Sequence, residues 1–378
     1  MVFWSFRSSF PTDLLIPMKT NQPKICIVGS LVGRHPGKIS TQGQILADLL
    51  LKEGFDVVAV SSKLNRLLRI LEIGFTLIWR RRTIDITIVE VYSGASFFIA
   101  DLVSLLGKCL GLRTIGVLHG GSLPEFAAKY PNWSARVFRR FTELVAPSLF
   151  LQQVVSKLGF EVRVISNVID LKGYPFKLRR EISPKLIWMR AFHSIYNPEL
   201  AIKAFALVRE KHSNATLVMA GVDKGLESSI KQMVRSLGLQ EVVRFPGFLD
   251  SKAKVLEFPQ ADIYLNTNDI DNMPVAVVES CAFGRPVVST DVGGISSLLK
   301  HETEGILVQR DNAQAIAEAV DRLLDDPDLT EQISYNGRSL AERSSWESVR
   351  PSWVRLFGEL GFPSTVRVSS AVAGRTSA

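Results

Sequence analysis

The chain of 378 residues is too long for one ordinary hydrophobic core and has the length of two domains of roughly 150 to 180 residues each. Hydrophobic residues make up 46% and charged residues 22%, which is the composition of a soluble globular protein. The net charge of +8 favours an anionic partner without identifying it, so nucleotide phosphates, anionic lipid and nucleic acid all fit.

Cysteine spacing and hydrophobicity argue against three further features. Cys26, Cys109 and Cys281 are odd in number and lack a CxxC spacing, so we expect reduced, buried thiols rather than a zinc site or disulfides. The most apolar segment, residues 97–118, is interrupted by charged side chains, which argues against a membrane span. Residues 1–23 lack the continuous apolar core of a signal peptide, and we interpret them as an N-terminal extension.

Short β-rich runs alternate with helical patterns along the first part of the chain. A strand over residues 24–28 leads into a glycine-containing loop and a helix over 41–53, which is the first unit of a Rossmann-like domain. Further strands are expected over residues 56–60, 84–91, 114–118, 143–146 and 162–165. Such alternation implies a parallel sheet covered by helices on both faces, and we place this domain at residues 24–170.

The alternation resumes after residues 171–184, whose Pro, Gly and basic residues predict an interdomain linker. A second Rossmann-like domain is expected over residues 185–345. Its strands are expected over residues 186–189, 215–220, 242–245, 261–267, 286–289 and 305–308. Aromatic and aliphatic residues recur at helical spacing over 346–360, which is typical of a packed helix face, and the composition of 361–378 predicts a disordered tail.

Residues 271–294 have the pattern of an anion-binding helix start. Pro274 suits the first turn of a short helix and Gly284 the position just after its end. Asp271 precedes this helix and Glu279 lies within it, roughly 8 to 12 Å away at ~1.5 Å rise per residue. Because unpaired N–H groups at a helix start favour anions, a sugar linked through a diphosphate to a ribose could span the two carboxylates. A loop Asp and a helix Glu in ordinary ion pairs are the alternative.

This segment resembles the signature of retaining glycosyltransferase family 4, whose fold is GT-B. The resemblance rests on Asp271-x7-Glu279, followed by Ser-Cys-Ala-Phe-Gly-Arg-Pro-Val-Val and Asp-Val-Gly-Gly. The family usually has Glu at both ends of this spacing, so Asp271 bears on sugar specificity more than on activity. The resemblance implies two Rossmann-like domains facing across a cleft, with 24–170 as acceptor domain and 185–345 as donor-nucleotide domain. It also implies that the helix over 346–360 crosses back onto the first domain.

The resemblance assigns roles to residues outside this segment. His119 follows the strand over 114–118, where the family commonly has a His-Gly pair facing the donor sugar. Gly37, followed by Lys38, stands where the family often has two adjacent glycines near the donor. Arg190 matches the arginine that clasps the diphosphate together with a lysine, and that lysine is missing here. A strand-end histidine bound to local carbonyls and a strand-end salt bridge for Arg190 are the structural alternatives.

By this resemblance the chain is expected to move a sugar, with retention of configuration, from a nucleotide-diphosphate sugar to a hydroxyl of a glycan or polyprenyl-linked acceptor. Cell-surface polysaccharide or glycolipid synthesis is the expected context. The expected catalytic residues are Asp271, Glu279, Arg190 and His119. The expected donor-binding residues are Gly37, Arg190, Asn272, Met273, Pro274, Val275 and Glu279. We expect no metal, because the one relevant Asp-x-Asp pattern, at 269–271, lies within the family signature. We also expect no cofactor and no nucleic-acid partner.

Residues 64–82 form a basic amphipathic segment, in which leucines, isoleucines, Phe75 and Trp79 are flanked by five arginines. Such a segment can lie on an anionic membrane surface, and burial against the sheet explains its apolar residues equally well. The expected reduced thiols indicate a cytoplasmic protein, and this segment adds a possible peripheral contact with the inner face of the plasma membrane.

Three other functions compete with the transferase hypothesis. A GT-B sugar-nucleotide epimerase would share the fold and donor site but need no acceptor. A nicotinamide oxidoreductase is disfavoured because no strict GxGxxG follows the first strand. The missing lysine and the Asp at 271 also permit a non-catalytic partner subunit that binds a nucleotide sugar.

Overall fold

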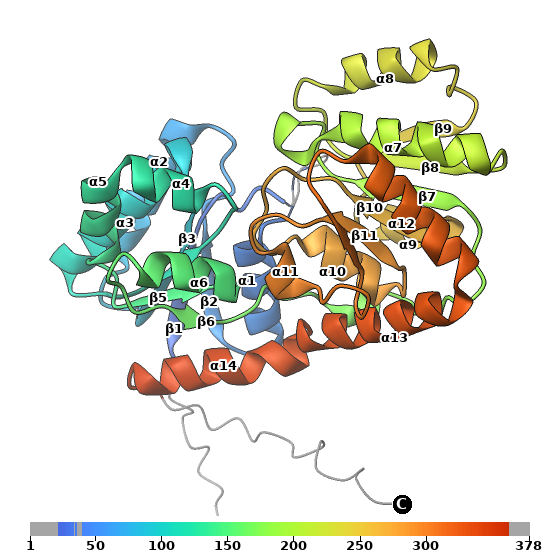
Figure 1. The fold of residues 1–378 in the computed structure, drawn as a ribbon. Helices are drawn as coiled ribbons and strands as arrows, with labels where there is room; N and C mark the ends of the chain where they lie inside the picture. The colour runs from blue at the N-terminus through green and yellow to red at the C-terminus, as the bar shows by residue number, and fades with distance from the viewer. Residues whose placement is uncertain (1–21, 34, 36–39, 363–378) are drawn as a thin grey trace, which may run out of the picture.

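The computed structural model describes residues 22–33, 35 and 40–362. Two α/β domains lie side by side, each built on a six-stranded parallel sheet (Figure 1). Gly37, Lys38, nearly all of the expected N-terminal extension and most of the expected tail lie outside the described residues. None of the described helices is both long and apolar enough to cross a membrane.

The N-terminal sheet has the strand order β2-β1-β3-β4-β5-β6. Its strands are β1 (Lys24–Val28), β2 (Asp56–Val60), β3 (Ile86–Val91), β4 (Arg113–Leu118), β5 (Glu143–Ala146) and β6 (Arg163–Val164). All the expected strands are present, with ends shifted by a residue or two. These strands are mostly apolar on both faces, because helices cover the sheet on both sides.

Helices pack on both faces of this sheet. They are α1 (Gln42–Lys52), α2 (Arg66–Trp79), α3 (Phe97–Leu110), α4 (Leu123–Lys129), α5 (Pro131–Phe138) and α6 (Leu149–Ser156). One face is filled by α1 through Leu46 and Leu50, and the other by α2 and α3 through residues such as Ile73 and Phe97. Thr41 is the N-cap of helix α1, and its Oγ1 accepts a hydrogen bond from the Gln44 N–H.

The C-terminal sheet has the order β12-β11-β10-β7-β8-β9. Its strands are β7 (Lys185–Met189), β8 (Thr216–Ala220), β9 (Val243–Gly247), β10 (Ile263–Asn266), β11 (Val287–Thr290) and β12 (Ile306–Val308). The strand order reverses between β7 and β10. In sheets of this kind ligands bind beyond the carboxyl ends of the strands at such a reversal. The loops after β7 and β10 are therefore where a ligand is expected.

The C-terminal domain is covered by seven α-helices before the last helix of the described chain. They are α7 (Pro198–Lys211), α8 (Glu227–Ser236), α9 (Ser251–Glu257), α10 (Val275–Ala282), α11 (Ile295–Leu298), α12 (Ala313–Asp325) and α13 (Pro327–Arg343). Pro274 is the N-cap of α10, with ψ 115°, so the expectation that it lies in the first turn is wrong by one residue. Gly284 follows the helix with φ +77°, a left-handed conformation that glycine adopts without strain, as expected.

The last helix, α14 (Trp346–Glu359), crosses back onto the N-terminal domain (Figure 1). Its side chains Trp353 and Phe357 are buried in the same apolar cluster as α1. The indole N–H of Trp346 donates to Glu53 Oε1 over 3.0 Å. These contacts confirm the expected return of this helix to the first domain.

The segment expected to be a linker is held against the C-terminal domain in its second half. The Arg179 side chain is buried, and its Nε donates to Asp262 Oδ1 over 3.0 Å. The Arg179 backbone N–H donates to Ser334 Oγ over 3.0 Å. Charged linker residues are thus anchored to one domain.

The three cysteines do not share one environment. Cys26 and Cys281 are buried, and burial raises the pKa of each thiol to about 12. Cys109 is exposed, so the expectation of three buried thiols is wrong for this residue. It lies in the last turn of α3, on the solvent side of the helix.

Candidate functional site

A cleft of about 1180 Å³ lies between the two domains and is lined by residues of both. Its walls are loops after the carboxyl ends of the strands, including His119 after β4, Arg190 after β7 and Asp271 after β10. Tyr92 and Glu279 also line it. The strand-order reversal of the C-terminal sheet opens into this cleft, so we place the functional site here.

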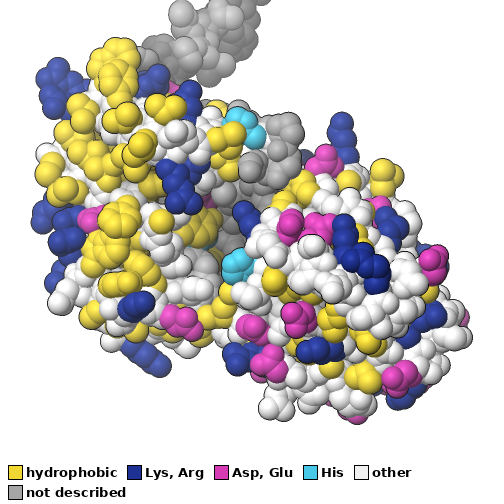
Figure 2. Space-filling model, turned by 90° about the horizontal axis from the view of Figure 1, so that it is seen from above, with side chains coloured by type: hydrophobic (Ala, Val, Ile, Leu, Met, Phe, Trp, Pro, Cys, Tyr) yellow, Lys and Arg dark blue, Asp and Glu magenta, His cyan; other side chains and the backbone are white. Residues whose placement is uncertain are grey.

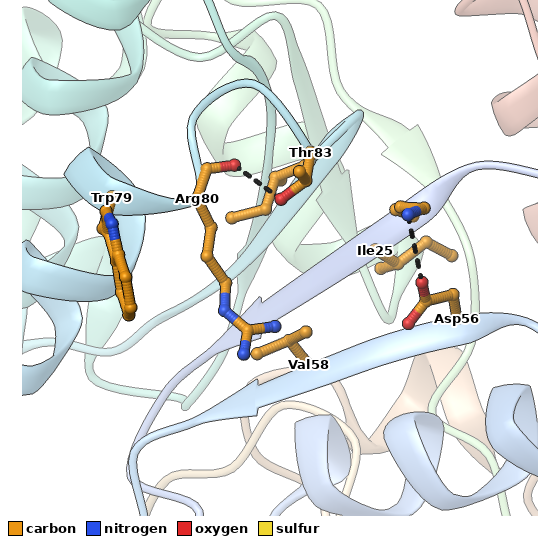
Figure 3. A pocket seen from close by; sticks show the side chains of 8 residues that line it. Ile25, Asp56, Val58, Trp79, Arg80 and Thr83 are labelled. Atoms are coloured by element: carbon orange, nitrogen blue, oxygen red, sulfur yellow. Dashed lines mark hydrogen bonds and ion pairs between the residues drawn. The ribbon is translucent and has the colours of Figure 1, made fainter.

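A second pocket, of about 360 Å³, lies at the amino ends of strands β1 and β2 of the N-terminal sheet (Figure 3). Lys24 and Asp56, the first residues of β1 and β2, form an ion pair of 3.7 Å there. Trp79 and Arg80, at the end of α2, form another wall. Because the amino ends of parallel strands are not where such sheets bind ligands, we do not assign this pocket to the functional site.

Arg190 and Asp271 stand on either side of the strand-order reversal. The Arg190 guanidinium forms an ion pair with Asp271 Oδ2 and lies over the Tyr196 ring, 4.1 Å from its centroid. Burial alone would lower the pKa of Arg190, but Asp271 and Tyr196 outweigh it and the pKa is raised, so the side chain stays charged. Its Nε is buried without a hydrogen-bond partner among the described residues. One N–H of the guanidinium therefore remains for a ligand.

Glycines hold the Asp271 loop in place from both domains. The Gly294 N–H donates to the Asp271 carbonyl over 3.0 Å, and a Cβ at Gly293 would lie 2.0 Å from that oxygen. Across the cleft, a Cβ at Gly121 would lie 2.9 Å from Asp271 Cα. Contacts below 3.0 Å are too close for a side chain, so the glycine pairs after β4 and after β11 permit this approach.

Glu279 points from α10 into the cleft and is already bound by two donors. Lys254 Nζ, from α9, donates to both carboxylate oxygens over 2.7 and 2.8 Å. The Tyr174 hydroxyl donates to Oε1 over 2.7 Å. Burial and the neighbouring Glu279 raise the pKa of Tyr174, so this hydroxyl remains a donor. Both oxygens of the Glu279 carboxylate are thus paired with protein donors.

Lys254 is a site residue that sequence reasoning missed. The resemblance places the second phosphate-binding cation shortly after Arg190, whereas Lys254 follows β9. The sequence position of Lys254 did carry a signal, because a lysine soon after a strand of a parallel sheet lies at the ligand-binding end of that sheet. Nothing in the sequence distinguished it from the neighbouring Lys252, which also lines the cleft.

The start of α10 faces the cleft, as expected, but Asn272 does not line it. Met273, Pro274 and Val275 line the cleft, and no side chain caps the first N–H groups of the helix. The buried Asn272 side chain instead contacts the Ser148 hydroxyl of the N-terminal domain. Asn272 therefore joins the two domains, because its amide oxygen accepts a hydrogen bond from Ser148.

His119 lies in the cleft wall as a neutral imidazole. Its ring stacks on Tyr92 with centroids 4.9 Å apart, and burial lowers its pKa to about 4. Its Nε2 lies 3.9 Å from Glu90 Oε1, which is not an ion pair when the ring is neutral. Among the described residues no carbonyl accepts a hydrogen bond from this ring, so the local-carbonyl alternative finds no support.

Glu90 is a buried carboxylate inside β3 that sequence reasoning missed. It accepts hydrogen bonds from the Gly43 N–H (2.7 Å) and Thr41 Oγ1 (3.0 Å) at the start of α1. Burial raises its pKa to about 7, although these hydrogen bonds act to lower it. A Cβ at Gly29 or Gly43 would lie within 3.0 Å of the carboxylate, so two glycines make room for it.

Replacing Glu90 by Gln should remove one pH-dependent contribution to stability. The pKa rises on folding from 4.5 to about 7, so the folded state holds a proton that the unfolded state has lost, and stability falls as pH rises through this window. The contribution lost is about 3 kcal/mol at most. Urea unfolding of both proteins from pH 4.5 to 8 should show a flatter profile for Glu90→Gln. A stability difference that does not change with pH would contradict the assignment.

Among the described residues no group of three or more His, Cys, Asp or Glu side chains could hold a metal ion. The two carboxylates of the Asp-x-Asp pattern have different partners. Asp269 accepts a hydrogen bond from Asn197 Nδ2 over 3.0 Å, while Asp271 pairs with Arg190.

Solved structures with this architecture define the class of fold. The Anabaena protein HepE in complex with UDP superposes with a TM-score of 0.69 at 17% identity, covering 89% of this chain and 100% of that one. Sucrose-phosphate synthase from Thermosynechococcus elongatus superposes with a TM-score of 0.75 at 15% identity, covering 90% and 99%. The chain has the GT-B fold, as the resemblance implied.

Residues 175–340 of the chain match the family model of the glycosyl transferases group 1. An uncharacterized glycosyltransferase of Methanocaldococcus jannaschii is 31% identical over 160 residues, 42% of this chain and 40% of that protein. The alpha-D-kanosaminyltransferase of Streptomyces kanamyceticus is 26% identical over 164 residues, 43% and 42%. The aligned segments thus span about two fifths of these curated relatives.

Proposed function

We propose that this chain is a retaining glycosyltransferase that uses a nucleotide-diphosphate sugar as donor. The observation that carries the proposal is the charged Arg190 at the strand-order reversal, with a buried N–H free for a ligand. The uncapped start of α10 lies in the same cleft wall and adds N–H groups that favour an anion. A diphosphate would meet a guanidinium and a helix start together.

The donor would lie along α10. Glu279 would exchange one of its present donors for ribose hydroxyls, the diphosphate would lie near the helix start, and the sugar would lie near Asp271 and His119. Neutral His119 offers the sugar a hydrogen bond without placing a second cation beside Arg190. UDP is the first nucleotide to test, because the structurally similar HepE was solved with UDP and with UDP-glucose.

In the proposed reaction, the bond between the anomeric carbon and the phosphate oxygen breaks, and its electron pair leaves with the nucleotide diphosphate. The acceptor hydroxyl bonds to the anomeric carbon from the same face, and its proton passes to the departing phosphate. Stabilising the charge that develops on a leaving group is commonly a large catalytic contribution. Arg190 and the start of α10 would supply it here.

We assign the role of the missing lysine to Lys254. Its ammonium lies in the cleft beside Glu279, and its side chain is 20% exposed, so it is held by the carboxylate rather than solvated. When ribose hydroxyls occupy Glu279, the flexible lysine side chain would be free to turn toward the phosphates. The diphosphate would then have two cations rather than one, without a metal ion.

The proposed acceptor is a hydroxyl of a glycan or of a polyprenyl-linked sugar, in cell-surface polysaccharide or glycolipid synthesis. We propose a cytoplasmic location with peripheral contact with the inner face of the plasma membrane. The N-terminal domain would present the acceptor, because its loops after β3 and β4 form the cleft wall opposite the donor residues.

A thermal-shift panel tests the donor site. UDP, GDP, ADP and their sugar conjugates are added to purified protein and to Arg190→Ala. A ligand that binds only the folded state stabilises it by about 2.7 kcal/mol at a hundredfold excess over its Kd. We expect one nucleotide to raise the melting temperature of the wild type by several degrees and to have little effect on the variant.

Either of two results would change the proposal. Folded wild-type protein that responds to no nucleotide would favour a function outside nucleotide-sugar chemistry. A nucleotide-sugar shift without transfer to any acceptor would favour a sugar-nucleotide epimerase or a non-catalytic partner subunit, and sugar analysis of the recovered donor separates these two.

A further inference from the structure

Helix α2 exposes an apolar face to solvent. Six of its large apolar side chains are more than half exposed: Leu67, Leu68, Leu71, Phe75, Ile78 and Trp79. At 100° per residue they fall within an arc of about 120° around the helix axis. No charged residue lies within that arc, and Leu64, just before the helix, extends it. We call this set with Leu64 the outer stripe.

The fold does not use the outer stripe. The opposite side of α2 packs on the sheet through Ile73 and Leu77, which are fully buried. The expectation that burial against the sheet could account for the apolar residues of this segment is therefore wrong for most of them. Helix α3, which packs beside α2, adds the exposed Phe98 and Leu105. Viewed from above, hydrophobic side chains cover much more of the N-terminal domain than of the C-terminal domain (Figure 2).

Positive charge lies at both ends of the outer stripe. Lys63 and Arg66 stand at its start, and Arg80 to Arg82 directly follow the helix. Within the described part of the chain, no carboxylate forms an ion pair with any of these four arginines. The one acidic residue of the helix, Glu72, is turned toward the Ser61 hydroxyl. The surface is therefore apolar along its length and cationic at its ends.

We propose that the outer stripe and its terminal arginines dock on an anionic lipid surface, with α2 lying in the plane of the membrane. Helices that lie at this interface bury an apolar face among the acyl chains and keep cations at the headgroups, which is the pattern here. Helix α2 has 14 residues and does not span the bilayer. Its start follows the carboxyl end of β2, the edge of the sheet that faces the cleft, so a docked helix brings the cleft near the lipid headgroups.

Vesicle co-flotation of the full chain tests the proposal. We expect the wild type to bind vesicles of equal parts phosphatidylcholine and phosphatidylglycerol, to bind phosphatidylcholine alone much more weakly, and to dissociate as salt rises. The triple variant Leu71→Ser, Phe75→Ser, Ile78→Ser should lose at least about tenfold in partitioning. Leu237→Ser with Tyr335→Ser, two exposed apolar residues of the C-terminal domain, is the matched control and should bind like the wild type.

The charged and aromatic positions give two further measurements. Replacing Arg80, Arg81 and Arg82 by Gln should weaken binding by about fivefold for each arginine that lies at the headgroups. Lipids brominated in the acyl chain should quench Trp79 fluorescence on binding. Trp79→Phe should keep most of the binding and lose this quenching.

Three outcomes would overturn the proposal. The proposal is overturned if the wild-type protein does not bind anionic vesicles. It is also overturned if the triple variant still binds them and binding is lost only when residues 1–21 are deleted. Sedimentation showing a wild-type dimer that the triple variant dissociates, without vesicle binding, would make the outer stripe an interface between copies of this chain.

This inference deepens the peripheral location proposed above, and its readout separates it from the enzymatic proposal. Protein that binds vesicles but shows no nucleotide-induced thermal shift keeps the docking surface and loses the donor site. Protein that shows the nucleotide-induced shift but does not bind vesicles keeps the donor site and loses the docking surface.

Discussion

Replacing Asp271 by Asn should lower sugar transfer by at least about a hundredfold, the loss typical when a group that stabilises developing charge is removed. The amide keeps the size of the side chain but removes the charge beside Arg190. Because the guanidinium then has no anionic partner, nucleotide diphosphate should bind as well as before or more tightly. Transfer measured with radiolabelled donor, together with calorimetric UDP affinity, should therefore show loss of turnover without loss of binding.

Asp269→Asn is the matched control, because this carboxylate is in the same loop but pairs with Asn197. Its transfer rate should remain close to that of the wild type. If Asp271→Asn transfers sugar within a few-fold of the wild type, Asp271 serves only as the structural counter-ion of Arg190.

Replacing Lys254 by Met should weaken UDP binding by roughly 10- to 100-fold, the range of one hydrogen bond to a charged group. Uridine, which lacks phosphates, should bind as well as to the wild type, because Glu279 is then free for ribose hydroxyls. The difference between the two ligands, measured by calorimetry, identifies Lys254 as a phosphate contact. Lys254→Arg should recover part of the UDP affinity, since the cation is restored.

Lys252→Met serves as the control for charge alone, because Lys252 is exposed at the cleft rim two residues earlier. It should lower UDP affinity far less. Equal losses for UDP and uridine in Lys254→Met would mean that the lysine only neutralises Glu279 and does not reach the phosphates.

The fold was predictable because its signals are local. Short β-rich runs such as Lys24–Val28 and the alternation with helices specify parallel sheets without reference to distant residues. The aromatic spacing of residues 346–360 predicted a packed helix face, and the family resemblance supplied its partner. Prediction was less accurate at element ends, as Pro274 shows, because a proline suits both the N-cap and the first turn.

The sequence by itself determined that Asp271 and Glu279 lie on one short segment, because Pro274 and Gly284 specify where its helix starts and ends. Only the tertiary structure decided what each carboxylate binds. Arg190 reaches Asp271 and Lys254 reaches Glu279 because strands far apart in sequence end at one sheet edge. The same holds for the direction of the apolar residues on α2, since a helix with apolar residues on two sides does not specify which side packs on the sheet.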